Sequence, residues 1–120
     1  MLLFRSFVCA ASVAVLLSGI AISVAGEADP AMLEAGKAVV WDRQKGNCLA
    51  CHVVEDGELP GNVAPALISM QARFPNKADL RAKIWDPTES NPLTMMPPFG
   101  RHRILTEDEI DQVVEYIYSL

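Results

Sequence analysis

Three residues within five positions could do chemistry together, because Cys48, Cys51 and His52 form the pattern C-x-x-C-H. This spacing is typical of a c-type haem attachment site. On a helical turn, residues three apart share a face, so both thiols can form thioethers to the vinyl groups of one porphyrin. The imidazole that follows can then coordinate the iron from one side. The sequence therefore predicts one covalently bound haem c with His52 as an iron ligand.

Two other kinds of site use the same residue types. Cys48, Cys51 and His52 are also legitimate zinc ligands, and His102 could complete a set of four. Structural zinc sites usually bring a second paired motif, however, and this sequence has none. A reactive C-x-x-C dithiol would be expected within a thioredoxin-like βαβ pattern. No strand-rich run is present, so haem attachment is favoured.

A candidate for the sixth iron ligand lies in the proline-rich segment 88–103, which has neither helical nor alternating period. A loop this apolar is expected to cover an apolar part of the structure, which here would be the haem. A thioether opposite His52 would give the His/Met ligation that raises the reduction potential in cytochromes c. We expect Met96 to be this ligand, because two prolines stiffen the backbone after it, and Met95 to point the other way and pack. His102 is the alternative ligand, although its arginine neighbours indicate that it faces solvent.

The segment after the C-x-x-C-H motif can support its histidine. A ligating histidine normally donates its other ring N–H to an acceptor, often a backbone carbonyl. A polar, turn-rich loop over residues 55–62 leads into the sequence V-A-P-A-L at 63–67. We expect the carbonyl of Pro65 to accept this hydrogen bond and Leu67 to pack on the haem face.

The amino terminus has the features of an export signal. Arg5 supplies a positive charge, an apolar run extends over residues 7–25, and Ser23-Val24-Ala25 offers a small-x-small processing pattern. We expect a signal peptide over residues 1–26, cleavage after Ala25 or Gly26, and a periplasmic location without membrane insertion of the mature chain. The alternative is a retained anchor, because the apolar run approaches the roughly 20 residues that span a bilayer.

Residues 27–120 then form one small domain, whose own hydrophobic core would be marginal. A large apolar cofactor would supply the missing interior. The formal net charge of the whole chain is -5 at pH 7, which disfavours nucleic-acid binding.

Helical periodicity predicts three main helices: residues 29–45, residues 76–86, and a last helix opened by Thr106. Asp29 and Asn76 are expected caps, and Thr106 with Glu109 forms a capping box. The last helix combines a buried stripe with an acidic face that is expected to be its outer one: the stripe is Ile110, Val113, Val114 and Ile117, and the acids are Glu107, Asp108, Asp111 and Glu115.

Two further contacts can be expected from residue types. Gly36, inside the first helix, costs about 1 kcal/mol relative to alanine, so we expect it to mark a close crossing with the last helix. Arg81 and Trp85 could bond the haem propionates, although packing in the core or facing solvent is an equal alternative for them.

The order of these features resembles the class I cytochromes c, an all-α fold in which a small helical domain wraps around one covalently bound haem. This chain departs from it in the longer linker between Gly36 and Cys48. More narrowly, it resembles the monohaem SoxX subunits of the bacterial sulfur-oxidation system. The residues that carry this narrower resemblance are K-G-N-C-L-A-C-H at 45–52, L-P-G-N at 59–62, W-D-P-T at 85–88, and N-P at 91–92 through M-P-P-F-G-R at 96–101.

The resemblance implies a periplasmic complex with a SoxA-like cytochrome subunit, which oxidatively joins thiosulfate to a cysteine of a carrier protein, an L-cysteine S-thiosulfotransferase type of enzyme. The chemistry would take place at the partner's haem. This chain would accept the electrons at its His52/Met96 haem, pass them to a downstream electron-acceptor cytochrome, and contribute no catalytic acid, base or nucleophile. The alternatives are a free-standing monohaem carrier for another dehydrogenase or oxidase and, less in keeping with a bound Met96, a haem sensor or small peroxidase.

Overall fold

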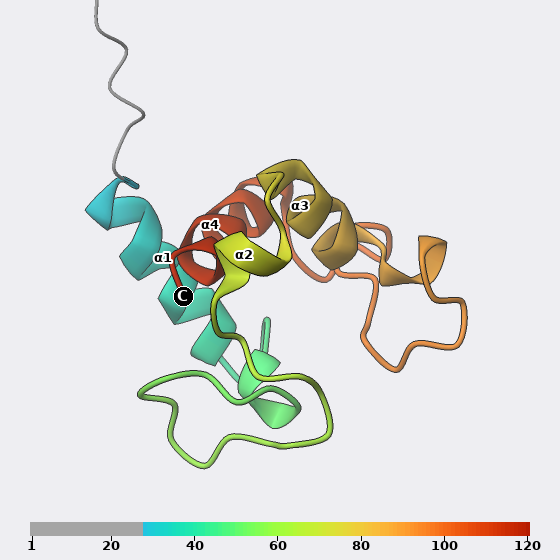
Figure 1. Ribbon diagram of the computed structural model, residues 1–120, viewed down its shortest axis with the longest axis horizontal. Helices are drawn as coiled ribbons and strands as arrows, with labels where there is room; N and C mark the ends of the chain where they lie inside the picture. The colour runs from blue at the N-terminus through green and yellow to red at the C-terminus, as the bar shows by residue number, and fades with distance from the viewer. Residues whose placement is uncertain (1–27) are drawn as a thin grey trace, which may run out of the picture.

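The computed structural model describes residues 28–120, so the predicted signal peptide and its cleavage lie outside the described residues. Every regular element in the described part of the chain is helical, which confirms the all-α prediction (Figure 1). In order, the elements are α1 (Pro30–Trp41), the 3₁₀ turn η1 (Cys48–Ala50), α2 (Met70–Arg73), α3 (Lys77–Trp85), the 3₁₀ turn η2 (Pro87–Glu89) and α4 (Glu107–Tyr118).

The predicted caps set the beginnings of the three main helices. The Asp29 side chain accepts a hydrogen bond from the Ala31 amide at 2.9 Å, and that of Asn76 accepts from the Ala78 amide at 3.2 Å. Thr106 and Glu109 form the capping box of α4, with both reciprocal hydrogen bonds present. These side chains satisfy amides that the first turn of a helix leaves without a partner.

The end of the first helix was predicted wrongly. The helix α1 ends at Trp41 and does not continue to residue 45. The amides of Lys45 and Asn47 donate to the carbonyl oxygen of Asp42, and the amide of Gly46 donates to that of Val39. The chain therefore folds back on the end of α1. The short helix α2 and the turn η2 were not predicted, because runs of three or four residues carry no periodic signal.

The two terminal helices cross closely at Gly36, as the sequence predicted. A Cβ atom placed on Gly36 would lie 2.0 Å from the carbonyl oxygen of Gln112 and 2.9 Å from the Cβ of Tyr116, both on α4. The backbones can approach this far only because position 36 has no side chain. In Figure 1, α1 and α4 cross and α3 lies along the other side of α4.

One hydrophobic core lies between these helices, and the predicted stripe of α4 is buried in it. Tyr116 is also buried there, which was not predicted. The core members are Val39, Val40, Val54, Leu67, Met70, Leu80, Ile84, Phe99, Leu105, Ile110, Val113, Val114, Tyr116 and Ile117. Met70 fills this core, with 2% of its surface exposed. Among the described residues, no helix has the length and hydropathy needed to cross a membrane.

The acidic face of α4 lies on the outside of the molecule, as predicted: Glu107, Asp108 and Asp111 are exposed and Glu115 is half-buried. The sequence did not predict that most of the α4 carboxylates pair with cations from other elements. Lys45 contacts Glu109, and the Lys77 Nζ lies 2.9 Å from Glu115. Arg81 contacts two carboxylates, at 2.6 Å from both Glu107 and Asp111.

The partners of Arg81 and Trp85 also decide the role of these two residues. The Trp85 Nε1 donates to Glu107 at 2.9 Å, and Arg81 donates to Glu107 and Asp111. Both side chains therefore fasten α3 to α4, and their donors are directed at α4 and not at haem propionates.

We predict that Gly36→Ala destabilises the protein although alanine is the better helix former. The new methyl group would meet the α4 backbone, and overpacking of this kind costs about 1–3 kcal/mol. Urea unfolding followed by circular dichroism measures the change. Ala38→Gly, at an exposed position of the same helix, should cost only the propensity difference of about 1 kcal/mol. A Gly36→Ala protein as stable as the wild type would refute the close crossing.

We further predict that Glu107→Gln flattens the loss of stability in acid. Hydrogen bonds from Arg81 and then Trp85 lower the pKa of Glu107 below its ordinary 4.5. A carboxylate with a depressed pKa contributes stability that is complete above the unfolded-state pKa and is lost as the pH falls through the folded-state pKa. The measurement is the unfolding free energy between about pH 6 and pH 3.

Asp108→Asn is the matched control for Glu107→Gln. Asp108 is exposed on the same helical turn and forms no ion pair with any residue in the described range. Its substitution removes a carboxylate from the same turn without breaking an ion pair. Equal slopes for Glu107→Gln and the wild type would show that the pairing with Arg81 contributes nothing in acid.

Candidate functional site

The C-x-x-C-H motif forms the short helical turn that the sequence predicted. The turn η1 begins at Cys48, directly after Asn47, whose φ of 48° reverses the chain. The amides of Cys51 and His52 both donate to the carbonyl oxygen of Cys48, at 3.2 and 2.9 Å. The three side chains that would hold a haem therefore come from one turn. Both cysteine side chains are half-buried, and neither forms a disulfide within the described residues.

The structure argues against the two other interpretations of this motif. Burial raises the pKa of the Cys48 thiol to about 11, whereas a reactive C-x-x-C thiol has a depressed pKa. The zinc interpretation needs Cys48, Cys51, His52 and His102 to lie together. In the described part of the chain, no three His, Cys, Asp or Glu side chains come together as a metal site.

The imidazole of His52 is oriented by a backbone carbonyl. Its Nδ1 lies 2.6 Å from the carbonyl oxygen of Pro65, the position that the sequence analysis chose for this contact. With Nδ1 as the donor, Nε2 carries the free lone pair and is the nitrogen available to a metal. The bond fixes both the tautomer and the direction of the ring.

Two backbone hydrogen bonds keep the Pro65 segment alongside the motif. The amide of Ala64 donates to the carbonyl oxygen of Cys51 at 3.0 Å, and the amide of Leu67 donates to that of Val53 at 2.8 Å. These bonds lie on either side of Pro65 and hold its carbonyl in place. Leu67 is buried in the hydrophobic core with 7% of its surface exposed. Its contact with a haem face stays a prediction.

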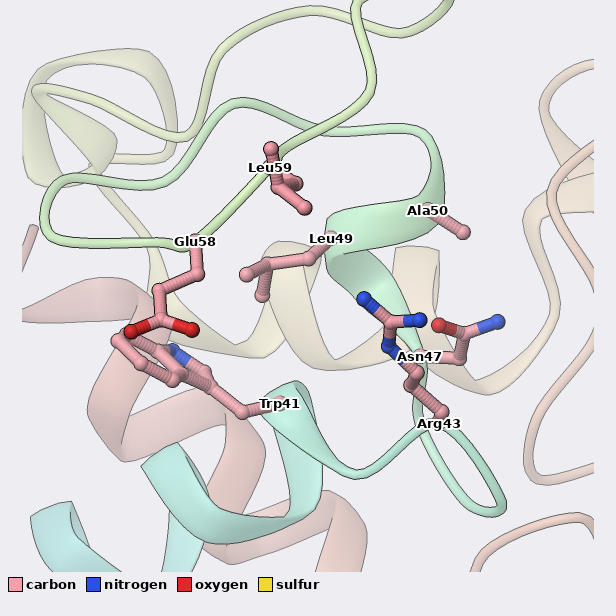
Figure 2. A pocket seen from close by; sticks show the side chains of 7 residues that line it. All are labelled: Trp41, Arg43, Asn47, Leu49, Ala50, Glu58 and Leu59. Atoms are coloured by element: carbon pink, nitrogen blue, oxygen red, sulfur yellow. The ribbon is translucent and has the colours of Figure 1, made fainter.

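The polar loop that follows the motif packs back on it. The amide of Gly61 donates to the carbonyl oxygen of Leu49 at 2.6 Å. A cavity of about 430 Å³ lies between this loop and the end of α1 (Figure 2). In Figure 2, Leu49, Leu59 and Trp41 gather with Glu58 on one side of the cavity, and Arg43 and Asn47 lie on the other. The residues between the two cysteines line it, but the cysteines and His52 do not, so this cavity is distinct from the proposed haem contacts.

The two methionines of the proline-rich segment differ in exposure. Met96 is half-buried and packs against the same hydrophobic core that Cys48 contacts. Its amide donates to Thr94 Oγ1 at 3.1 Å. Met95 has 84% of its surface exposed, so the expectation that it packs was wrong. Of the pair, only Met96 turns toward the interior.

His102, the alternative iron ligand, is exposed in the turn after this segment. Its backbone amide donates to the carbonyl oxygen of Pro98 at 3.0 Å, which keeps it in the tight turn that ends the loop.

Sequence reasoning missed one buried charge beside this loop. Asp86 is 3% exposed and pairs with Arg101 at 3.1 Å. An acidic residue before the Pro87-Thr88 pair is the signal that could have found it, because aspartate followed by proline is a typical start of a helical turn.

The residues present fit a haem. A turn supplies two unpaired thiols and an imidazole whose Nε2 is the free nitrogen, and the core that contacts Cys48 also contacts a half-buried thioether at Met96. Imidazole and thioether are the pair of axial ligands found in cytochromes c.

Comparison with known proteins agrees with this chemistry. The family model "Cytochrome c" matches residues 33–120. A crystal structure described as SoxXA from P. pantotrophus superposes with a TM-score of 0.65 and 26% identity, covering 72% of this chain and 80% of that one. An uncharacterised lipoprotein of Aquifex aeolicus (strain VF5) is 32% identical over 77 residues, which are 63% of this chain but only 37% of the lipoprotein.

Because the family model covers most of the sequence, this chain belongs to the cytochrome c family, contains covalently bound haem c, and carries that family's C-x-x-C-H motif at Cys48, Cys51 and His52.

Proposed function

We propose that this chain is the SoxX-like electron-transfer subunit of a complex with a second, SoxA-like cytochrome, and that His52 and Met96 are its two iron ligands. The observation that carries the ligand assignment is the hydrogen bond from His52 Nδ1 to the Pro65 carbonyl, because it directs Nε2 toward a metal. When bound, the haem supplies an iron that exchanges single electrons.

The residues of the chain set how that exchange proceeds. His52 keeps its ring proton on Nδ1 at Pro65 O, so the ring remains a neutral ligand of fixed direction. The Met96 thioether is a neutral, soft donor that favours the reduced iron and raises the potential. Leu67 and the other buried apolar side chains would keep water away from the haem iron. No side chain here is assigned a role as acid, base or nucleophile.

The distribution of charge supports a docking partner. Residues 59–72 and 91–100 contain no charged residue, and they carry Pro65 and Met96. Five of the seven large hydrophobic side chains that are exposed lie in these two stretches: Leu59, Val63, Ile68, Leu93 and Met95. Figure 1 shows both loops extending to the same side of α3 and α4. An uncharged apolar surface of this kind favours a partner with an equally uncharged contact face.

The thiosulfate step rests on the likeness to SoxXA and on the sequence resemblance alone. In this proposal the chain is exported with residues 1–26 as its signal peptide, functions in the periplasm as domain 27–120, and transfers electrons from the partner to a downstream electron-acceptor cytochrome. A free-standing monohaem carrier is the alternative, and the exposed loops would then contact several partners in turn.

We predict that Met96→Ala retains the haem but lowers its reduction potential. The thioethers hold the porphyrin without the sixth ligand, whereas loss of the sulfur removes a stabiliser of the reduced iron. The fall should be on the order of 100 mV, within the roughly 0.8 V range that axial ligands span. Potentiometry and the reduced absorption spectrum measure it.

Met95→Ala is the matched control for Met96→Ala, because Met95 is the neighbouring methionine and its side chain is exposed. The potential and spectrum of Met95→Ala should equal those of the wild type. If Met95→Ala produces the change and Met96→Ala does not, the ligand assignment is wrong.

We predict that the protein purified from thiosulfate-grown cells carries a second, larger cytochrome, and that thiosulfate with the carrier protein reduces the haem of this chain within the complex.

Leu93→Asp combined with Met95→Asp should release the partner, because two carboxylates would have to be buried unpaired. Size-exclusion chromatography at low and high salt measures the complex. It should be insensitive to salt, since the surface carries no charge.

Ala38→Asp adds a carboxylate to an exposed position of α1 and is the control. It should leave the complex intact. A monomer that exchanges electrons with several cytochromes would instead support the free-standing carrier, and a haem that stays oxidised in an intact complex would refute the thiosulfate assignment alone.

A further inference from the structure

The segment that carries Met96 begins at a buried charge. Asp86 stands between α3 and η2 and has 3% of its surface exposed. A carboxylate removed from water is costly unless it is paired and hydrogen-bonded. The partners of the Asp86 carboxylate lie at both ends of the loop over residues 88–101.

At the beginning of this loop, Asp86 caps the turn η2. One carboxylate oxygen accepts from the amide of Thr88 at 3.0 Å and also from the hydroxyl of Thr88. The turn continues with the amide of Asn91 donating to the carbonyl oxygen of Pro87 at 3.0 Å. The first turn of the loop is thus built on Asp86.

At the far end of the loop, the other carboxylate oxygen of Asp86 accepts from Arg101 Nη1 at 3.1 Å. The same nitrogen lies 3.4 Å from Thr88 Oγ1. The carbonyl oxygen of Trp85 accepts from the amides of Gly100 and Arg101, at 3.0 and 3.3 Å. A Cβ atom on Gly100 would lie 2.0 Å from Trp85 Cδ1, so only glycine allows this approach. Residues 85 and 86 therefore hold both ends of the loop together.

Short-range hydrogen bonds connect this closure to the proposed iron ligand. The amide of Thr94 donates to the carbonyl oxygen of Asn91 at 3.0 Å, and the amide of Met96 donates to Thr94 Oγ1 at 3.1 Å. The loop is otherwise without regular structure between Glu89 and Thr106. A segment of this kind opens locally at a small cost unless its ends are fixed.

We propose that Asp86 is a positioning residue that closes the loop over residues 88–101 and thereby sets how readily the Met96 sulfur leaves the haem iron. This inference rests on the proposed ligation by Met96. It assigns to Asp86 a specific role in ligand retention that a general contribution to folding would not give it.

The test compares Asp86→Asn and Arg101→Gln in the haem-loaded chain. Each removes the ion pair between the two ends of the loop, and Arg101 has 57% of its side chain exposed, so its substitution leaves the core intact. Cyanide binds ferric haem only when the sulfur has left, so its binding rate measures the open population. We expect binding to be roughly tenfold faster for Asp86→Asn and about threefold faster for Arg101→Gln, with Arg101→Lys restoring part of the wild-type rate.

Two spectroscopic readouts accompany the cyanide rate. As the pH is raised, the charge-transfer band from the thioether sulfur to ferric iron should disappear at a lower pH in both variants than in the wild type. The amides of Asn91 and Gly100 should exchange hydrogen faster, while those of Ile110 and Val113 in the core of α4 exchange as before.

Lys77→Gln is the matched control for Arg101→Gln, because it removes a partly exposed cation from another ion pair, Lys77–Glu115, between α3 and α4. It should leave the cyanide rate and the charge-transfer band unchanged. Wild-type rates in Asp86→Asn and Arg101→Gln, or an equal acceleration in Lys77→Gln, would overturn the proposal. A wild-type protein without the charge-transfer band would overturn the ligation by Met96 itself, so the two failures are distinguishable.

Discussion

The close crossing of α1 and α4 at Gly36 is the contact on which the rest of this structure depends. The two helices lie near opposite ends of the described chain, and the carbonyl of Gln112 occupies the space that a side chain at position 36 would fill. The C-x-x-C-H turn follows α1 after the amide of Gly46 has folded back onto Val39. The Met96 loop leads into α4. The crossing therefore fixes the positions of the end of α1 and the beginning of α4, and the segments that carry the two proposed ligands, His52 and Met96, adjoin these two points.

Electrostatic pairing divides the surface into two parts with different properties. Four carboxylates of α4, those of Glu107, Glu109, Asp111 and Glu115, pair with Lys45, Lys77 or Arg81 and so connect α4 to other parts of the chain. The loops around the haem motif and Met96 carry no charge over residues 59–72 and 91–100. Pairs of this exposure contribute modestly to stability. The two uncharged stretches instead carry five exposed large hydrophobic side chains, which makes them the apolar part of the surface.

The sequence predicted what is encoded locally and missed what depends on distant partners. Helix caps at Asp29, Asn76 and Thr106 act on amides two or three residues away, so residue type and spacing suffice to find them. The motif turn follows from the same kind of short-range rule. The Pro65 carbonyl lies 13 residues from His52, and it was chosen because a ligating histidine normally donates its other ring N–H to a backbone carbonyl.

The errors and the omissions share one physical cause. The early end of α1 depends on amides turning back to Asp42 and Val39, and the pairing of the α4 acids depends on cations 26 to 64 positions away. The exposure of Met95 and the burial of Asp86 likewise follow from how the loop closes. Periodicity contains no information about such contacts, because it describes which face of an element is apolar and not what lies opposite that face.

The two sides of the proposed iron site are held by interactions of very different strength. His52 lies in the same turn as two cysteines that bond covalently to the porphyrin, and its ring is fixed by Pro65. Met96 has no covalent tether and is held by a loop whose ends meet at Asp86, Trp85 and Arg101. Covalent bonds do not open under physiological conditions, whereas loops held by a few hydrogen bonds do. Any variation in ligation, and hence in potential, must therefore arise on the methionine side, where the sequence can adjust the contacts that close the loop without disturbing the attachment of the cofactor.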